Sequence, residues 1–267
     1  MVVDTQSAFD DRNIPIDKVG IKGLTYPVTV LDKRHRIQHT VATVNMFANL
    51  PHHFRGTHMS RFVEVFQAHY KNIQMKGFLS MLEDVRKALD AEAAFVDLSF
   101  PYFIEKEAPV SRQKSLLEYR CSYIGELNGE HRSFFVGIEV PINTVCPCSK
   151  EISRFGAHNQ RGIVRLTVQL GPFFWIEDMI EEIEASASAG IYTLLKREDE
   201  KFITEHGYEH PRFVEDVARE VVLRVERFAA FPWFRVEVEN MESIHNHNAY
   251  ACIERGKRER SVWNSIV

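Results

Sequence analysis

The order of the predicted strands and helices constrains the fold of this chain more than any other feature of its sequence. Apolar and polar residues alternate in several segments, which is the period of a β-strand with one buried face. These segments are 96–102, 117–123, 134–140, 164–170 and 234–238. Elsewhere apolar residues recur every three or four positions, as in a helix that packs on one face. These helical stripes run over 78–89, 176–187 and 214–225, with a shorter helix over about 60–70 that has Ser60 as its N-cap.

Taken in chain order, these elements follow one pattern twice. Two extended segments, two helices and two strands form the first set, and the remaining strands and helices form the second. The chain is therefore predicted to be α+β, with two ββααββ modules whose antiparallel sheets are covered by a layer of helices. Because such sheets leave edges uncovered, oligomerisation is one way to cover them. The expected parts are an N-terminal segment over 1–20, a first module over 21–128, a second over 129–254 and a loosely held tail over 255–267.

Composition and charge exclude several classes of function. The chain carries 33 Lys plus Arg against 37 Asp plus Glu, a formal net charge of −4. It therefore has no general basic excess for a nucleic-acid backbone, although a local basic cleft for a small polyanion is compatible with it. The sequence has no apolar run of about 18 residues, which predicts no membrane span. Its start lacks the apolar core of a signal peptide, and its four Cys are typical of reduced thiols, so we expect a cytoplasmic protein.

Residues 141–162 interrupt all periodicity between two predicted strands, and we expect a functional loop there. The loop contains Cys146, Cys148 and, twelve residues after the first of these, His158. Thiolate and imidazole are the ligands that a borderline-soft divalent metal prefers. A two-cysteine zinc knuckle needs more than one residue between its cysteines, so only one of the two is expected to bind metal. The alternative is a pair of buried structural cysteines.

Two further motifs offer groups for binding or proton transfer. His245 and His247 follow a predicted strand and lie two residues apart, so in an extended chain they point the same way. They belong either to a metal, phosphate or proton-transfer site or to an ordinary surface pair. Residues 56–61 open the short first helix with backbone N–H groups, a hydroxyl and Arg61, which suits an anion. A capped helix start without a ligand explains the same residues equally well.

Local pattern gives two carboxylates an ordinary structural interpretation. Glu200 lies in the charge run 196–201, which is typical of a solvated helix end. Glu215 lies beside an apolar stripe with Arg219 four residues on, which indicates a surface salt bridge.

Five separate motifs, however, together resemble the GTP cyclohydrolases of the IB type. They are GTHMSRF at 56–62, CPCSKEIS-x-x-GAHNQR at 146–161, LLKR-x-DEK at 194–201, FVED at 213–216 and ESIHNH at 242–247. The similarity runs from Asn13 to Ile253, and the tail beyond it is not matched. The resemblance implies the tunnelling fold, a homotetramer with its sites between subunits, and hydrolysis of GTP to 7,8-dihydroneopterin triphosphate and formate. It also implies a place at the entry to folate biosynthesis.

The resemblance further implies roles for individual residues. Cys146 matches a metal-binding thiolate, and His158, Glu200 and His245 match the other positions of a zinc, manganese or iron site. Cys146, His158 and His247 match catalytic positions, with His247 as a candidate proton carrier. Glu215 matches the carboxylate that anchors the purine, because one carboxylate can accept from both N1–H and the 2-amino group of guanine. The candidates for the triphosphate, chosen by charge and motif position, are Arg61, Lys150, Arg161, Lys196 and Arg197.

Two alternatives remain beside this interpretation, and one is excluded. The first is another tunnelling-fold enzyme that uses its Cys as a nucleophile on a pterin or deazapurine. The second is a zinc-dependent nucleobase deaminase, which needs Pro-Cys-x-x-Cys; Pro147 and Cys148 are followed by Ser, Lys and Glu, which excludes that motif. The third is a non-catalytic protein that binds purine or metal, and formate release from GTP separates it from the enzyme.

Overall fold

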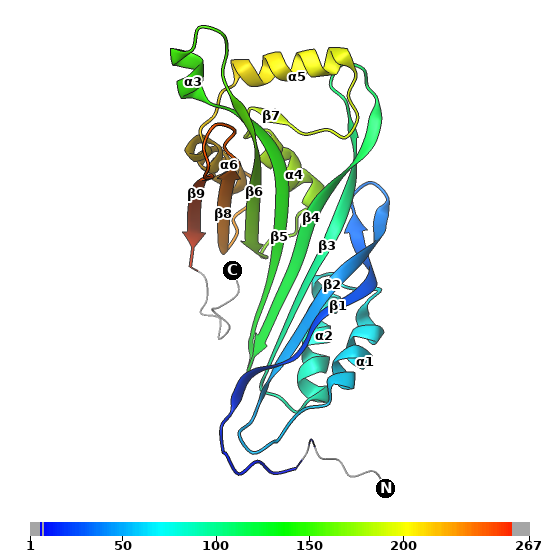
Figure 1. Cartoon of the computed structure of the whole chain (residues 1–267). Coiled ribbons are helices and arrows are strands. Elements are labelled where there is room, and N and C mark those ends of the chain that lie inside the picture. The colour runs from blue at the N-terminus through cyan, green and yellow to red at the C-terminus, as the bar shows by residue number, and fades with distance from the viewer. Residues whose placement is uncertain (1–5, 7, 258–267) are drawn as a thin grey trace. The chain divides into compact units, whose positions relative to one another are not determined.

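Antiparallel strands and α-helices make up the described part of the chain, which comprises residue 6 and residues 8–257 of a computed structural model (Figure 1). In chain order the elements of this part are β1 (Ile16–Asp32), β2 (Arg36–Leu50), α1 (Met59–His69), α2 (Met75–Ala88), β3 (Ala93–Glu107), β4 (Lys114–Asn128), β5 (His131–Val145), α3 (Pro147–Ile152), β6 (Asn159–Gln169), α4 (Ile176–Glu184), β7 (Ala189–Gly190), α5 (Arg197–Glu209), α6 (Val214–Phe228), β8 (Trp233–Asn240) and β9 (Ala249–Gly256). The predicted α+β class is confirmed.

The chain divides into two compact units. The first contains the described residues up to Pro101 together with Ser122–Val136. The second contains Tyr102–Cys121 together with the described residues from Gly137 onward. Because β3, β4 and β5 each contribute residues to both units, the division does not follow the predicted module boundaries, and those boundaries stay a prediction.

In the first unit the strand order is β1-β2-β3-β4-β5. β1 and β2 pair antiparallel with Tyr26 opposite Ala42, and β2 and β3 pair antiparallel with Met46 opposite Val96. Helices α1 and α2 pack against each other and bury large apolar side chains. Gly125 of β4 allows the close approach of α2, because a Cβ there would lie 2.5 Å from the Phe78 ring.

In the second unit the strand order is β3-β4-β5-β6-β8-β9, and the short β7 pairs with β5. β6 and β8 pair antiparallel with Val164 opposite Val238. Helix α6 packs against β8, β9 and α4. Alternate residues of β6 and β8 are buried, as the period of two predicts. The opposite face of β6 carries Arg161 and Arg165, the first of them exposed and the second half-buried.

Three sequence expectations need correction, while the solvated helix end expected at Glu200 is confirmed. Ser60 is not the N-cap, because α1 begins at Met59 and His58 holds the capping position. The loop expected over 141–162 is largely ordered: β5 extends to Val145, α3 forms one short helix and β6 begins at Asn159. Glu200 is exposed in the first turn of the 13-residue helix α5. The expected C-terminal tail begins inside β9, which continues to Gly256, and its residues 258–267 lie outside the described part.

No helix in the described part of the chain is long and apolar enough to cross a membrane.

Candidate active site

The ends of β5 and β6 bring Cys146 and His158 together. Cys146 follows the last residue of β5, and its backbone N–H donates to the carbonyl of His158 at 3.1 Å. Cys146 is also the N-cap of α3, and its Sγ accepts from the backbone N–H of Ser149 at 3.4 Å. Cys146 is half-buried while Cys148 is exposed on α3, so the alternative of two buried structural cysteines is wrong. Pairing of neighbouring strand ends therefore makes Cys146 and His158 neighbours through their backbones.

Hydrogen bonds fix the orientation of His158. Its backbone N–H donates to Ser149 Oγ at 3.2 Å, and that hydroxyl donates to the carbonyl of Cys146 at 3.1 Å. The ring Nδ1 lies 3.1 Å from Gln160 Oε1 and 3.3 Å from Ser243 Oγ. Among the described residues nothing partners Nε2, which leaves that nitrogen available to a ligand. A ring held through one nitrogen and open at the other is the arrangement of a metal-binding histidine.

The loop between β8 and β9 carries the other two candidate histidines. Its Ser243 contacts the ring of His158, so the loop is connected to the Cys146 region. The rings of His245 and His247 stack with their centroids 5.2 Å apart, and both side chains are exposed. Residues 243–247 form bends rather than the extended chain that the prediction from their spacing assumed, so the stacking has another local origin.

Asp199 fixes the start of α5 and was missed by the sequence analysis. It is fully buried and accepts from the backbone N–H groups of Val110, Ser111 and Lys196 at 2.8–2.9 Å and from Ser111 Oγ at 2.6 Å. Burial opposes its charge, but the hydrogen bonds from Ser111, Lys196 and Val110 hold the pKa of Asp199 well below its ordinary value. Glu200 follows directly and is exposed. Asp199 therefore anchors the helix turn that presents Glu200.

This anchor gives a prediction for stability against pH. The charged form of Asp199 stabilises the fold above the ordinary aspartate pKa of about 3.9, and this contribution is lost as the pH falls towards the lowered folded-state pKa. Urea unfolding of Asp199→Asn should therefore show a large loss of stability at neutral pH that shrinks at acid pH. Glu198→Gln removes an exposed carboxylate one position earlier and should follow the wild type. A deficit of Asp199→Asn that is the same at every pH would contradict the role of the charge.

The predicted metal residues are only partly assembled within one chain. Cys146 and His158 are neighbours, and the loop of His245 is linked to them, while Glu200 lies on α5. Within the described residues, no three His, Cys, Asp or Glu side chains form a group that could hold a metal ion. The Cys146 thiol and the open nitrogen of His158 nevertheless suit a borderline-soft divalent metal. A complete set of metal ligands therefore requires either groups from outside this chain or a movement that brings Glu200 and His245 to Cys146 and His158.

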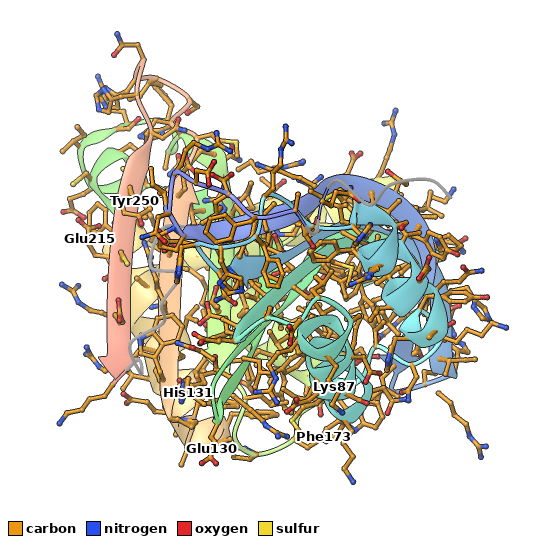
Figure 2. All side chains as sticks on the ribbon, turned by 90° about the horizontal axis from the view of Figure 1, so that it is seen from below. Lys87, Glu130, His131, Phe173, Glu215 and Tyr250 are labelled. Atoms are coloured by element: carbon orange, nitrogen blue, oxygen red, sulfur yellow. The ribbon has the colours of Figure 1, made fainter. Side chains whose placement is uncertain are left out.

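Glu215 stands free at the start of α6. It is exposed (Figure 2), and no hydrogen bond or ion pair joins it to the rest of the described chain. Arg219 instead pairs with Asp216 at 3.8 Å. The expected salt bridge between Glu215 and Arg219 is therefore wrong. On a helix, Arg219 can reach a carboxylate either three or four residues before it, and here it pairs with Asp216. Both oxygens of Glu215 remain available to a ligand.

The five candidate cations for the triphosphate belong to both units, and those of the second unit do not form one cluster. In the first unit, Arg61 Nη1 donates to the carbonyl of Ala88 at 2.9 Å. In the second unit, Lys150 Nζ donates to the carbonyl of Tyr208 at 2.5 Å, near the end of α5. Lys196 and Arg197 lie at the beginning of that helix, about 15–20 Å away by the rise of 1.5 Å per residue.

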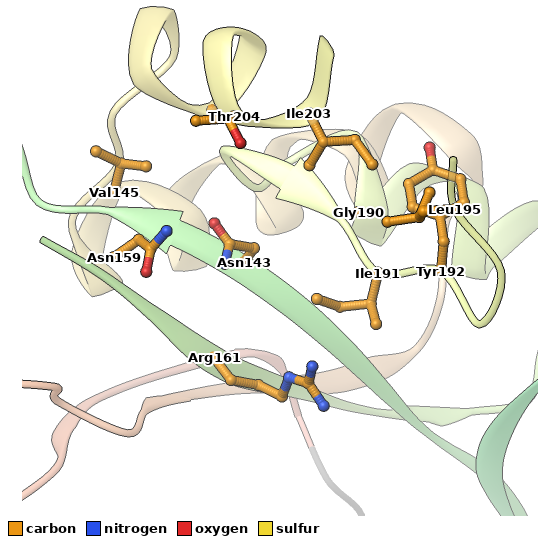
Figure 3. Close-up of a pocket in the computed structure, with 11 residues that line it drawn as sticks. Asn143, Val145, Asn159, Arg161, Gly190, Ile191, Tyr192, Leu195, Ile203 and Thr204 are labelled. Carbon is orange, nitrogen blue, oxygen red and sulfur yellow. The ribbon is translucent and has the colours of Figure 1, made fainter. Parts of the chain in front are cut away.

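Arg161 lines a cavity in the second unit, formed by the ends of β5 and β6, the segment after β7, and α5 (Figure 3). Two asparagines line it as well, Asn143 on β5 and Asn159 on β6. A second, shallower hollow on α5 is lined by Arg197 and Glu200. Arg161 thus lies beside a partly enclosed cavity, whereas Arg197 lies beside the shallower hollow.

Solved structures with a similar fold include urate oxidases. A uricase from Bacillus fastidious aligns with a TM-score of 0.53 and 7% identity, over 90% of this chain and 92% of that one. The urate oxidase of Bacillus subtilis 168 aligns with a TM-score of 0.52 and 9% identity, over 90% of this chain and 98% of that one. At such low identity the likeness shows a shared fold and nothing about the reaction.

Sequence comparison defines the family. The family model for type I GTP cyclohydrolase FolE2 matches residues 2–251. The GTP cyclohydrolase FolE2 of Geotalea uraniireducens is 51% identical over 263 residues, which are 98% of this chain and 97% of that protein. The protein of the same name from Kosmotoga olearia is 56% identical over 254 residues, 95% of this chain and 98% of that protein. The chain therefore belongs to the FolE2 family of type I GTP cyclohydrolases.

Family membership confirms the prediction of a GTP cyclohydrolase, and with it the prediction of a hydrolase that acts on GTP. It favours this activity over the two alternatives left open, a tunnelling-fold enzyme with a nucleophilic Cys and a non-catalytic binding protein.

Proposed function

We propose that this chain is a GTP cyclohydrolase of the IB type that hydrolyses GTP to 7,8-dihydroneopterin triphosphate and formate, in the first step of tetrahydrofolate biosynthesis. The structural observation that carries the proposal is the pair formed by Cys146 and His158 at neighbouring strand ends. Opening the guanine imidazole ring requires water at C8, proton transfers and loss of formate. These neighbouring residues carry a thiol and an imidazole, which suit metal-assisted hydrolysis.

A divalent metal (zinc, manganese or iron) would be held by Cys146 and His158, with Glu200 and His245 as the further ligands. When bound, such a metal lowers the pKa of its water towards neutrality and so supplies hydroxide. His158 and His247 are the candidates for moving protons between water and the ring atoms. The exposed position of His247 beside His245 keeps it accessible to a substrate.

Glu215 would orient the base. Its two free oxygens match the N1–H and 2-amino donors on one edge of guanine, a pair that adenine lacks. The triphosphate would be bound by cations among Arg61, Lys150, Arg161, Lys196 and Arg197. The dispersal of these cations along the chain is consistent with a site to which more than one subunit contributes.

The proposed assembly is a homotetramer of the tunnelling fold, in the cytoplasm, with its active sites between subunits. Three features support a shared site: the incomplete metal ligand set, the exposure of Glu215, and the position of β1 and β9 as the first and last strands of the strand order. The overall activity is tested by formate release and by pterin fluorescence from GTP, with and without added divalent metal. If neither formate nor a fluorescent pterin forms from GTP with any of the divalent metals, the proposed activity is refuted.

Shared sites predict that activity depends on association. Dilution of the enzyme should lower its specific activity at the concentration where light scattering shows the tetramer dissociating. Re-concentration should restore both together. Full specific activity in a verified monomer would contradict sites built between subunits.

A further inference from the structure

We propose that the cavity lined by Asn143, Asn159 and Arg161 is the subsite for a phosphate group of the nucleotide substrate. The proposal rests on the proposed function and specifies where one part of GTP binds. It also selects Arg161 from the five candidate cations and adds two residues that the sequence analysis did not identify.

The cavity is small and partly enclosed. Its volume is about 180 Å³, and Figure 3 shows it between β5, β6, the segment after β7 and α5. Ile191, Leu195 and Ile203 give it an apolar wall. An apolar wall keeps water away from a bound group, and this strengthens the attraction between opposite charges.

Arg161 brings an uncompensated charge to this cavity. Arg165 lies four residues further along β6 on the same face of the sheet, and its Nη1 is 3.0 Å from Glu239 Oε2. Arg161 has no carboxylate partner within the described chain. Its guanidinium keeps all its donors for a ligand, and this planar fork matches two oxygens of one phosphate.

Two amide side chains complete the set of donors. Asn143 is half-buried, and its backbone carbonyl is fixed by the N–H of Ser188 at 3.2 Å. Asn159 begins β6 and lies two residues before Arg161 on the same face. In the described residues, neither side-chain amide has a hydrogen-bond partner. Each offers two N–H donors, and an acceptor-rich anion is the chemical group that a cation and two amides can bind together.

The cavity lies next to the proposed reaction centre. Val145 and Asn159 line it, and they adjoin Cys146 and His158 in the sequence. Arg161 is three residues from His158, or about 10 Å along an extended strand. That separation is comparable to the reach from a purine ring across the ribose to the phosphates.

The other cations of the second unit fit this role less well. Lys150 already donates to the carbonyl of Tyr208. Lys196 and Arg197 are exposed at the start of α5, where the adjoining hollow also contains carboxylates, Glu200 and Glu205.

Inorganic tripolyphosphate tests the subsite without turnover. Calorimetric titration of the purified oligomer should show binding to the wild type, at least tenfold weaker binding to Arg161→Gln, and a smaller loss for the double variant Asn143→Ala/Asn159→Ala. The matched variant Arg165→Gln removes a cation from the same strand and face, where it is already paired, and should bind like the wild type. Steady-state kinetics should show the same order, with KM for GTP raised and kcat changed less, as expected for lost uniform binding.

Three results would overturn the subsite: no tripolyphosphate binding to the wild type, equal binding by Arg161→Gln, or an equal loss in Arg165→Gln. Failure of the subsite can be distinguished from failure of the proposed function. A wild type that binds tripolyphosphate through Arg161 but releases no formate from GTP would retain the anion subsite and lose the cyclohydrolase reaction.

Discussion

Replacing Cys146 by Ala should abolish turnover and remove the bound metal together. The thiolate is the softest of the proposed ligands, and even partners outside the coordination sphere typically change metal affinity or activity 10–100-fold. We therefore expect kcat/KM for GTP to fall by more than about 100-fold. Elemental analysis of the same preparation should show the loss of bound metal.

The chain provides a matched control for this experiment. Cys148 is also a cysteine of the same segment, but it is exposed on α3 and has no assigned role. Cys148→Ala should keep normal metal content and turnover. Cys146→Ala should still fold, because the hydrogen bond from Ser149 Oγ to the carbonyl at position 146 does not involve the thiol. Normal metal and normal rate in folded Cys146→Ala would refute the assignment.

Much of the fold could be predicted because most elements bury one face. The alternation in β6 and the stripe of α6 each correspond to a row of buried side chains. The extent of helix α5 could not be predicted for the opposite reason: only Asp199 and Gly207 are buried in it, so it has no apolar stripe. Helix α3 has six residues, too few to show a period.

The candidate site was predictable only in part, since sequence spacing does not reveal distant partners. Cys146 and His158 are close in the chain, and the pairing of their strands brings them together. Asp199 lies in a charge run that is typical of solvated residues, yet its side chain is buried. There it accepts hydrogen bonds from Val110 and Ser111, which are nearly ninety residues away in the sequence. One local signal was present: an acidic residue three positions after Lys196 is typical of the capping box at a helix N-terminus.

Glu215→Gln should lower kcat/KM for GTP by a factor of tens to hundreds while metal content stays normal. A charge-assisted contact of one carboxylate with two donors contributes on the order of 2–4 kcal/mol to transition-state binding. The amide keeps the size of the side chain but replaces one carboxylate oxygen by an NH2 group. That NH2 group would face either N1–H or the 2-amino group of guanine, both of which are donors. Glu215 is exposed in the single chain, so this magnitude assumes that a neighbouring subunit shields it in the complete site.

Inosine triphosphate makes this test specific to the base. Inosine keeps N1–H but lacks the 2-amino group, so the wild type should prefer GTP over ITP, and Glu215→Gln should lose much of that preference. A general loss of stability would instead lower kcat/KM for GTP and for ITP by the same factor.

Arg219→Gln is the control for the local salt-bridge interpretation. Arg219 pairs with Asp216 rather than Glu215, so its removal should change stability by a few tenths of a kcal/mol and leave the GTP-to-ITP ratio unchanged. Near-normal turnover and an unchanged ratio in Glu215→Gln would show that the base is recognised elsewhere. A collapse of the ratio with intact metal would locate guanine recognition at the first turn of α6.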